Sequence, residues 1–233
     1  MREDVPHLRL SVIIPVYNEV TLIEESLRRV RAVELPLEVI VVDDGSTDGT
    51  RELLPTLAGI DRLILHDRNR GKGSAIRTGL EAVTGDVVVI QDADLEYDPR
   101  DFIPMLEKIE REGAQVVYGS RILGPSPRGY LTFYLGGRLL SLLTNVLYGT
   151  SITDEPTCYK MFRREVLAGI PLECDGFEFC PEVTAKVVRR GFRIVEVPIR
   201  YYPRGVSEGK KIRARDGWIA IWTLIRLRFA RMD

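Results

Sequence analysis

Short runs of aliphatic, often β-branched residues alternate with longer stretches of mixed polarity through the first half of the chain. Each run is apolar throughout, which is the pattern of a strand buried on both faces of a parallel sheet. The runs predict strands at residues 10–15, 38–42, 62–65 and 86–90, with helices between them at 21–33, 48–57 and 72–83. This order predicts an α/β fold with a Rossmann-like, mostly parallel sheet flanked by helices.

The second half of the chain is less regular. It predicts strands at 116–119 and 193–198, helices at 132–148, 178–190 and 218–231, and a Gly/Pro/Ser loop at 124–129. A chain of 233 residues is long enough for one well-cored domain, and no linker divides it into two. We therefore expect one α/β domain over residues 1–212 and a C-terminal amphipathic helix within residues 213–233.

Polar residues follow each of the first four predicted strands. In such sheets ligands bind beyond the carboxyl ends of the strands, and those ends share one edge. The polar segments are Tyr17-Asn18-Glu19, Asp43-Asp44-Gly45-Ser46, Arg68-Asn69-Arg70-Gly71 and Gln91-Asp92-Ala93-Asp94. We therefore expect a ligand site at this edge.

The fourth segment carries two carboxylates one residue apart and a third close behind, at Asp92, Asp94 and Glu96. Clusters of hard oxygen ligands suit Mg²⁺ or Mn²⁺, usually shared with substrate phosphates. Such an ion would neutralise a diphosphate leaving group. The alternative is a solvated turn whose Asp98 and Pro99 simply start the next helix.

Two other segments suit parts of a nucleotide. Asp43 or Asp44 can accept a hydrogen bond from a nucleobase or a ribose hydroxyl, although helix capping by Asp48 explains the same pattern. The glycine-rich segment around Lys72 lacks the spacing of a phosphate-binding loop of the Walker type. Its glycines still permit close backbone approach at a helix N-terminus, which suits an anion. No dinucleotide fingerprint follows the first strand, which argues against an oxidoreductase.

Several basic residues are candidates for binding anionic groups. The alternative for each of them is an ordinary surface charge. Arg138 is distinctive because it interrupts an apolar helix, where we expect it to need a buried or bound anion. The full set is Arg121 after Gly119-Ser120, Arg138, Arg204, Lys210 and Lys211.

The charge balance bears on the kind of binding partner, and the cysteines bear on the cellular compartment. The net charge of −1 gives no overall support for a nucleic-acid partner, but residues 209–233 carry seven basic against two acidic side chains. Three cysteines without CxxC spacing are typical of buried thiols in a reducing compartment. The chain shows neither a signal peptide nor an apolar run of about 18 residues, so we expect a cytoplasmic protein, peripheral on the cytoplasmic face of a membrane.

Taken in order, these motifs resemble those of the family 2 glycosyltransferases of GT-A fold, and most of all the synthases of dolichyl- or polyprenyl-phosphate mannose and glucose. The matching segments are SVIIPVYNE, VIVVDDGSTDGT, NRGKGSAIRTG, GDVVVIQDADLEYDP, VVYGSR and DEPTCYKMF. The resemblance covers residues 9–212 and identifies that region as a GT-A catalytic domain. Family members often carry C-terminal membrane spans, and this sequence departs from that pattern.

The resemblance assigns roles to particular residues. It implies nucleotide-sugar binding by Pro15, Tyr17, Glu19, Asp43 or Asp44, and Asp92, and we add Lys72 from the glycine-rich segment. It implies metal binding by Asp92 and Asp94 of the DXD motif and by Glu96, where similar enzymes often have Gln. It implies binding of the acceptor phosphate by Ser120, Arg121 and Arg138, and a mobile loop at 204–211 whose Arg204 and Lys210 meet the donor diphosphate.

These roles predict an inverting transfer of mannose or glucose from GDP-mannose or UDP-glucose to a polyprenyl or dolichyl phosphate. The acceptor phosphate, with a second pKa of about 6, is already an anion and needs no general base. A hydroxyl acceptor would need a base, and Asp154 is the best candidate. A third possibility is a non-catalytic subunit that binds nucleotide sugars.

The last predicted helix gathers aromatic and aliphatic residues on one face, with arginines flanking or opposing that face. The apolar residues are Trp218, Ile221, Trp222, Ile225 and Phe229. A helix of this kind can lie in a membrane surface or meet a membrane-spanning partner subunit. Because Leu224 and Leu227 fall outside the apolar face, packing on its own domain is the alternative.

Overall fold

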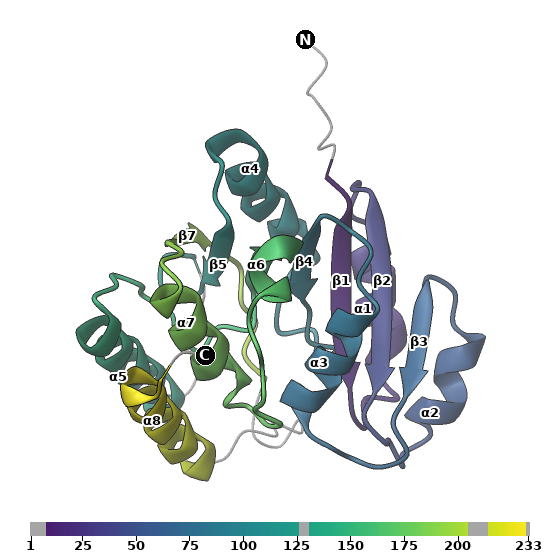
Figure 1. Cartoon of the computed structure of the whole chain (residues 1–233). Helices are drawn as coiled ribbons and strands as arrows, with labels where there is room; N and C mark the ends of the chain where they lie inside the picture. Colours follow the sequence, from purple (N-terminus) through teal and green to yellow (C-terminus); the bar gives the residue numbers. More distant parts are fainter. Residues whose placement is uncertain (1–7, 126–130, 205–213, 232–233) are drawn as a thin grey trace.

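In the computed structural model, residues 8–125, 131–204 and 214–231 are described, and they form a seven-stranded sheet with helices on both faces (Figure 1). The strands are β1 (Leu10–Val16), β2 (Leu37–Asp43), β3 (Arg62–Leu65), β4 (Val87–Ile90), β5 (Val116–Ser120), β6 (Lys160–Arg163) and β7 (Ile194–Pro198). Their spatial order is β3-β2-β1-β4-β6-β5-β7. The predicted mostly parallel α/β sheet of the GT-A type is confirmed.

Among the strands of the described residues, only β6 runs against its neighbours, pairing antiparallel with both β4 and β5. The sequence analysis missed this strand because four residues, three of them fully buried, show no alternation of polar and apolar positions. Because β6 lies between β4 and β5, the sheet contains two parallel groups. The first is β3-β2-β1-β4, and the second is the pair β5 and β7.

The helices are α1 (Ile23–Arg31), α2 (Thr50–Leu53), α3 (Lys72–Glu81), α4 (Phe102–Glu112), α5 (Leu131–Tyr148), α6 (Arg164–Ala168), α7 (Phe179–Arg189) and α8 (Ala214–Phe229), with short 3-10 turns at Leu54–Thr56 and Pro99–Asp101. No range was predicted for α4 or α6, although a helix start at Asp98 and Pro99 was the alternative for the carboxylate segment. Asp98 accepts from the Arg100 N–H at 3.0 Å and so caps the turn that leads into α4. The segment therefore starts a helix at Asp98, as the alternative in the sequence analysis had it, and this does not conflict with a metal-binding role of Asp92 and Asp94 upstream.

Two apolar layers sandwich the sheet. One joins alternate residues of β1, among them Val12 and Ile14, to α1 and α4, and includes Phe102. The other joins Ile13 of β1 and residues of β4 to α3, α6 and α7, and includes Phe179. Because both faces are covered, the central strands are apolar at successive positions, which is why they were recognisable from sequence.

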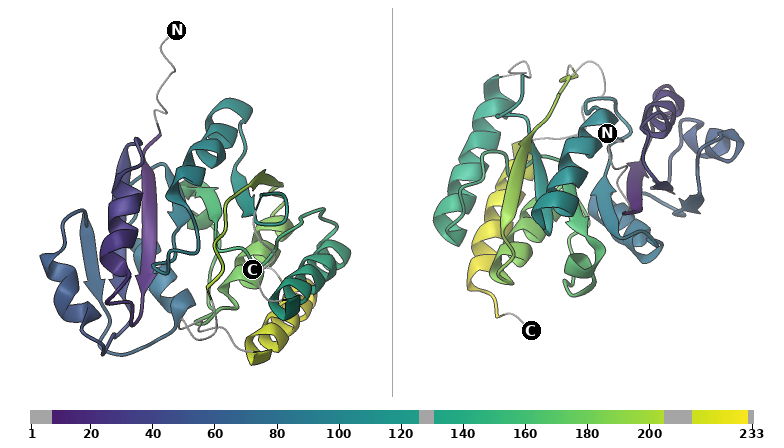
Figure 2. Two further views of the ribbon diagram at one scale, coloured as in Figure 1. Left: turned by 180° about the vertical axis from the view of Figure 1, so that it is seen from behind. Right: turned by 90° about the horizontal axis from the view of Figure 1, so that it is seen from above.

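Helices α5, α7 and α8 form a group beside the β7 end of the sheet, with α5 and α8 side by side in both views of Figure 2. Leu224 and Leu227 of α8 are buried against α7 and α5. The Tyr148 hydroxyl donates to the Leu224 carbonyl at 2.6 Å, and Arg189 Nη2 donates to the Ala230 carbonyl at 2.6 Å. The last helix therefore packs on its own domain through the two leucines, while its aromatic face points away.

Membrane crossing by any of these helices is not supported. Within the part of the chain that the structure describes, none is both long and apolar enough to span a bilayer.

Candidate active site

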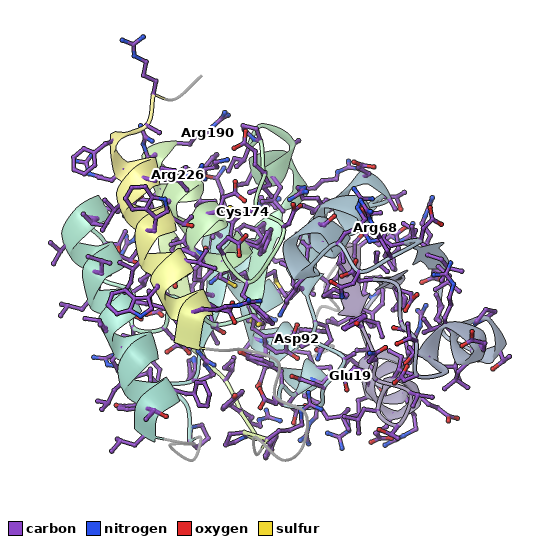
Figure 3. All side chains as sticks on the ribbon, turned by 90° about the horizontal axis from the view of Figure 1, so that it is seen from below. Glu19, Arg68, Asp92, Cys174, Arg190 and Arg226 are labelled. Atoms are coloured by element: carbon purple, nitrogen blue, oxygen red, sulfur yellow. The ribbon has the colours of Figure 1, made fainter. Side chains whose placement is uncertain are left out.

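Side chains from three separate segments meet at the carboxyl edge of the sheet. Glu19 follows β1, Asp92 and Asp94 follow β4, and Arg204 lies beyond β7. Figure 3 looks at the molecule from below and labels Glu19 and Asp92. Pro15 and Tyr17, at the end of β1, are half-buried at the same edge. The structure thus brings together residues that are up to 189 positions apart, from Pro15 to Arg204.

Arg204 connects the carboxylates of this edge. Its Nη2 lies 3.3 Å from Asp94 Oδ2 and 3.4 Å from Glu19 Oε1. Its backbone N–H donates to Glu96 Oε1 at 2.7 Å. The Arg204 Nε is buried and has no hydrogen-bond partner among the described residues. The guanidinium is therefore held in place and retains one donor for a bound anion.

Lys72 pairs with the first carboxylate of the DXD motif. Its Nζ lies 2.5 Å from Asp92 Oδ1 and donates to Cys158 Sγ at 3.0 Å. Burial disfavours the charged form of both groups, but their mutual attraction outweighs it. Asp92 therefore holds the pKa of Lys72 well above its usual range, and Lys72 lowers the pKa of Asp92. Lys72 therefore stays protonated beside the edge where a diphosphate would bind.

Asp94 is electrostatically different from Asp92. Burial, followed by repulsion from Asp92 and Glu96, raises the pKa of Asp94 to about 7, although Arg204 opposes the shift. A cation that binds here would relieve this repulsion. Between Asp94 and Glu96 the backbone of Leu95 adopts a positive φ of 62°, which is unusual for a branched residue and costs about 1 kcal/mol or more. The strained turn lies between the second and third carboxylates of this segment.

The carboxylates fit a divalent cation that is completed by substrate oxygens. Across residues 8–125, 131–204 and 214–231, no group of three or more His, Cys, Asp or Glu side chains is arranged to hold an ion by itself. Glu96, expected as a third ligand, accepts from the Tyr201 hydroxyl at 2.8 Å and from the Arg204 N–H at 2.7 Å. Asp92 and Asp94 with a diphosphate match the preference of Mg²⁺ for few carboxylates plus phosphates.

The two aspartates at the end of β2 differ in what they contact. Asp44 accepts from His66 Nδ1 at 2.8 Å and from the backbone N–H groups of Arg70 and Gly71 at 2.9 and 2.8 Å. It therefore organises the loop after β3. Asp43 has longer contacts, at 3.3 Å from the Ser46 N–H and 3.4 Å from Arg51 Nη1. Both side chains are buried, and Asp43 is the less tightly held of the two.

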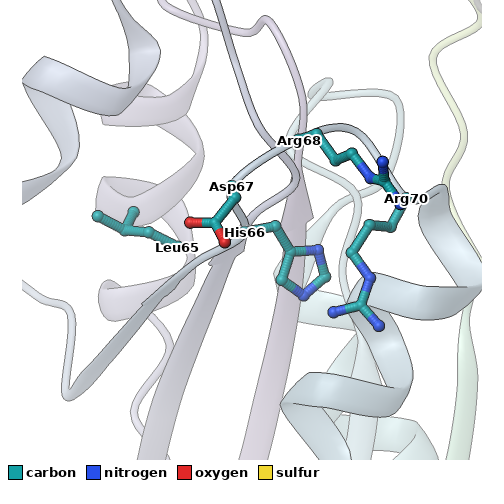
Figure 4. A pocket seen from close by; sticks show the side chains of 5 residues that line it. All are labelled: Leu65, His66, Asp67, Arg68 and Arg70. Carbon is teal, nitrogen blue, oxygen red and sulfur yellow. The ribbon is translucent and has the colours of Figure 1, made fainter.

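A cavity of about 530 Å³ lies along the loop that Asp44 organises (Figure 4). It is lined by Leu65, His66, Asp67, Arg68 and Arg70. Two arginines and a histidine give it a basic wall close to the carboxyl ends of β2 and β3. A polar or anionic part of a ligand suits this wall better than an apolar one.

The glycines around Lys72 serve a different purpose from the one expected. A Cβ at Gly71 would lie 2.3 Å from the Asp175 carbonyl oxygen, and one at Gly73 would lie 2.3 Å from that of Cys174. Ser74 N–H donates to the Asp175 carbonyl at 3.1 Å. The close backbone approach at the start of α3 is therefore made by the protein's own chain, and only the Lys72 side chain reaches the carboxylate edge.

A second group of predicted residues gathers at the end of β5. Arg121 donates through Nε to Asp154 Oδ2 at 2.8 Å and through Nη2 to Oδ1 at 2.7 Å, and its backbone N–H also donates to Oδ2. Ser120 Oγ is 2.6 Å from Thr153 Oγ1. Although burial opposes it, Arg121 lowers the pKa of Asp154. A carboxylate with both oxygens filled and a lowered pKa is a poor general base.

Arg138 joins this second group from outside. Its Nη1 donates to the Thr153 carbonyl at 3.0 Å, and the side chain is exposed on α5. Arg138 was expected to need a buried or bound anion. It has no buried one, because the apolar helix around it faces solvent on that side, and a bound anion stays a prediction. Lys210 and Lys211, with the rest of the predicted loop after Arg204, lie outside the described residues.

Sequence reasoning missed several residues of the site. Tyr201 connects the two groups, since its hydroxyl donates to Glu96 and its ring lies 5.0 Å from the Arg121 guanidinium. Cys158 was predicted to be a buried thiol without a role in the site, yet it accepts a hydrogen bond from Lys72. Neither residue has a local pattern that marks it. Only the Tyr201 position, three residues after β7, could have suggested a place at the strand ends.

A mostly parallel sheet with a carboxylate pair beyond β4 and basic side chains around it defines a GT-A-type α/β protein. The chain belongs to glycosyl transferase family 2, whose model matches residues 11–170. It is therefore a glycosyltransferase, and the resemblance of its motifs to that family is confirmed.

Individual relatives differ in length and name. An undecaprenyl-phosphate mannosyltransferase from Micrococcus luteus is 34% identical over 218 residues, which cover 87% of each protein. The low-salt glycan biosynthesis hexosyltransferase Agl6 from Haloferax volcanii is 29% identical over 215 residues, and the match covers 90% of this chain but only 51% of Agl6. This chain thus spans about half the length of that relative.

The fold also matches a solved structure. Glucosyl-3-phosphoglycerate synthase from Mycobacterium tuberculosis, in complex with Mn²⁺, UDP and phosphoglyceric acid, superposes with a TM-score of 0.73 at 24% identity. The match covers 97% of this chain and 80% of that one. At this identity the similarity is one of fold.

Proposed function

We propose that this glycosyltransferase transfers a hexose, mannose or glucose, from a nucleotide sugar to a polyprenyl or dolichyl phosphate with inversion at the anomeric carbon. The observation that carries the proposal is the two-point contact between Arg121 and Asp154. It leaves a cationic arginine on the acceptor side, and it occupies the carboxylate that would otherwise serve as the general base. The name of the Micrococcus luteus relative supports the same acceptor class.

The donor side of the proposal uses the carboxylate edge. Asp92 and Asp94 would hold Mg²⁺ or Mn²⁺ together with the diphosphate, and the ion when bound supplies Lewis-acid stabilisation of the leaving group. The structural relative bound to Mn²⁺ and UDP supports this reading. Asp43 and the basic cavity wall after β3 are the parts of this chain suited to the nucleoside of GDP-mannose or UDP-glucose.

In the proposed reaction an acceptor phosphate oxygen attacks the anomeric carbon as the bond to the nucleoside diphosphate breaks. Arg121 orients the acceptor, since its Nη1 makes no hydrogen bond to another described residue, and Arg138 lies on the same side. Arg204, through its buried Nε, and Lys72 stabilise the negative charge that develops on the departing diphosphate. No proton needs to be removed, because the acceptor phosphate is ionised near neutral pH.

Two alternatives make different demands on the same residues. A hydroxyl acceptor, such as the phosphoglycerate named for the structural relative, requires a base, and Asp154 would have to leave Arg121 to serve. A non-catalytic subunit would bind nucleotide sugar and turn nothing over. The peripheral location on the cytoplasmic face of a membrane, with or without a membrane-spanning partner subunit, belongs to the phosphate-acceptor proposal.

The test begins with titrations of GDP- and UDP-sugars with and without Mn²⁺. The preferred donor is then incubated with phytanyl phosphate, with phytanol and with 3-phosphoglycerate, and sugar-bearing products are identified by mass spectrometry. Product on phytanyl phosphate alone is the expected result. Product only on an alcohol would replace the proposal by the hydroxyl-acceptor reaction, and donor binding without any product would favour the non-catalytic subunit.

A further inference from the structure

Helix α5 is apolar around most of its circumference: Leu140, Leu143 and Leu147 pack toward α7 and α8, and a second apolar side faces solvent. Its buried residues are Ser141 and Thr144. Ser141 Oγ donates to the Gly137 carbonyl and accepts from the Glu155 N–H at 2.9 Å. The large apolar residues on its other side are between 55% and 74% exposed, namely Leu131, Leu135, Leu139, Leu142 and Val146. A helix in water normally turns such a stripe inward.

Helix α8 continues this apolar surface. Leu224 and Leu227 attach α8 to α5 and α7, which leaves Trp218, Trp222 and Phe229 between 63% and 78% exposed. In Figure 3 the two helices run side by side along one flank of the molecule. We call the exposed apolar residues of both helices the α5–α8 surface. Exposed large apolar side chains that gather on neighbouring helices mark interaction sites.

The charge around the surface favours an anionic partner. Helix α5 contains no acidic residue, and its one charged side chain is Arg138. Helix α8 carries Arg215, Arg226 and Arg228 against Asp216, which lies 3.7 Å from Arg215. The rest of the chain is therefore acidic, since the whole has a net charge of −1. Two copies of this basic surface would repel each other, whereas an anionic leaflet attracts it.

The exposed tryptophans of α8 also favour a lipid bilayer as the partner. Trp218 and Trp222 lie one turn apart on the exposed side of α8, close to arginines. Tryptophan prefers the boundary between headgroups and acyl chains, and long arginine side chains reach headgroups from an apolar face.

The α5–α8 surface borders the acceptor side of the active site. Arg138 projects from α5 and donates to the Thr153 carbonyl, while Thr153 Oγ1 contacts Ser120. The next residue, Asp154, holds Arg121. A phosphate at headgroup level could thus meet Arg138 and Arg121 while its hydrocarbon chain stays in the bilayer.

We propose that the α5–α8 surface seats this enzyme on an anionic bilayer, with both helices lying in the interface and Arg138 at headgroup level. The link to the acceptor rests on the proposed function, but the surface itself does not. In this arrangement both helices lie in the plane of the interface and neither crosses the bilayer. The two helices are distant in sequence, since α5 begins at Leu131 and α8 begins 83 positions later at Ala214, so the surface joins α5 to the C-terminal helix that the sequence pattern alone suggested.

The test is flotation of the full chain with phosphatidylcholine vesicles, with and without phosphatidylglycerol, at low and high salt and without donor. We expect binding that needs the anionic lipid and weakens with salt. The double variant Leu139→Glu/Leu142→Glu should lose about tenfold or more in partitioning, because it removes apolar area and adds repulsion. Ile103→Glu, at an exposed apolar position on α4 outside this surface, is the control and should bind like wild type.

Trp218→Ala/Trp222→Ala provides a second variant that adds no charge, and thermal unfolding of each protein checks its fold. A severalfold loss of partitioning is expected. Failure of wild type to bind vesicles, or full binding by a folded Leu139→Glu/Leu142→Glu variant, overturns the proposal. Wild-type dimers that this variant dissociates would assign the surface to a second copy. Vesicle binding without transfer to phytanyl phosphate would reject the proposed function and leave the surface intact.

Discussion

Arg121 and Asp154 face each other through two parallel contacts, Nε to Oδ2 at 2.8 Å and Nη2 to Oδ1 at 2.7 Å. The pair joins β5 to the segment before β6 and is largely buried. From the sequence, Arg121 was predicted to bind a phosphate acceptor, and Asp154 was the candidate base for a hydroxyl acceptor. Their contact means that Asp154 positions the arginine, and that a base at this place would first need to be freed.

Asp154→Asn tests this reading. Removing one partner of a buried pair leaves the other charge uncompensated, and we expect the free energy of unfolding to fall by about 3 kcal/mol. The KM for a phosphate acceptor should rise because Arg121 is no longer oriented. Urea unfolding and steady-state kinetics measure both. Lost turnover at unchanged stability and unchanged acceptor KM would instead identify Asp154 as a base.

Asp94→Asn tests the carboxylate pair. With the proposed ion and diphosphate missing one ligand, turnover should fall about 100-fold or more. The fold should remain intact, because Asp94 is a source of repulsion in the metal-free protein. Turnover close to wild type, or turnover indifferent to EDTA, would contradict the metal assignment.

The same substitution has a pH signature. Because burial and its neighbours raise the folded-state pKa of Asp94 to about 7, the folded state binds more protons than the unfolded state between about pH 4 and pH 7. This group therefore adds stability to the metal-free wild type as the pH falls below 7, and the addition is lost as the pH rises through 7. The Asn variant lacks that dependence. Chemical unfolding at several pH values in EDTA should show the two proteins diverging, with the variant the more stable above pH 7.

Arg204→Ala tests the donor side against a neighbour on the same segment. Loss of the guanidinium that contacts Asp94 and Glu19 should lower kcat/KM for the donor about 100-fold. Arg204→Lys should recover only part of it, since lysine lacks the planar fork. The control is Arg200→Ala, whose side chain pairs with Asp98 and Asp101 away from the DXD motif. Equal losses for Arg200→Ala and Arg204→Ala would show a general effect on the segment.

Two substitutions on α8 separate its packed side from its exposed side. Leu224 is fully buried against α5 and α7, so Leu224→Ala should destabilise the protein by about 2 to 4 kcal/mol. Trp222 is exposed, and Trp222→Ala should change stability by no more than about 0.5 kcal/mol. Thermal unfolding compares them. If Leu224→Ala leaves the melting temperature unchanged, α8 does not pack on the domain in solution.

Most of the sheet was predictable because its signal is local. Strands such as β1 and β4 are covered on both faces, so the sequence of each shows a continuous apolar run, and the polar residues that follow mark the carboxyl edge. The carboxylate pair was predictable for the same reason, because two aspartates follow a buried strand directly. The antiparallel β6 was not, since four residues between β5 and α6 carry too little pattern to identify a strand or its direction.

Contacts between distant residues depended on the tertiary structure alone. The order of the strands decides that Arg204 meets Glu19, that Lys72 meets Asp92, and that Arg121 meets Asp154. A protein core and a bilayer are both apolar, so the sequence of a helix does not show which of the two its apolar residues face. The sequence by itself determined that α5 and α8 are apolar helices. Only the packing of Ser141 and Leu224 inward decided which of their apolar residues remain at the surface.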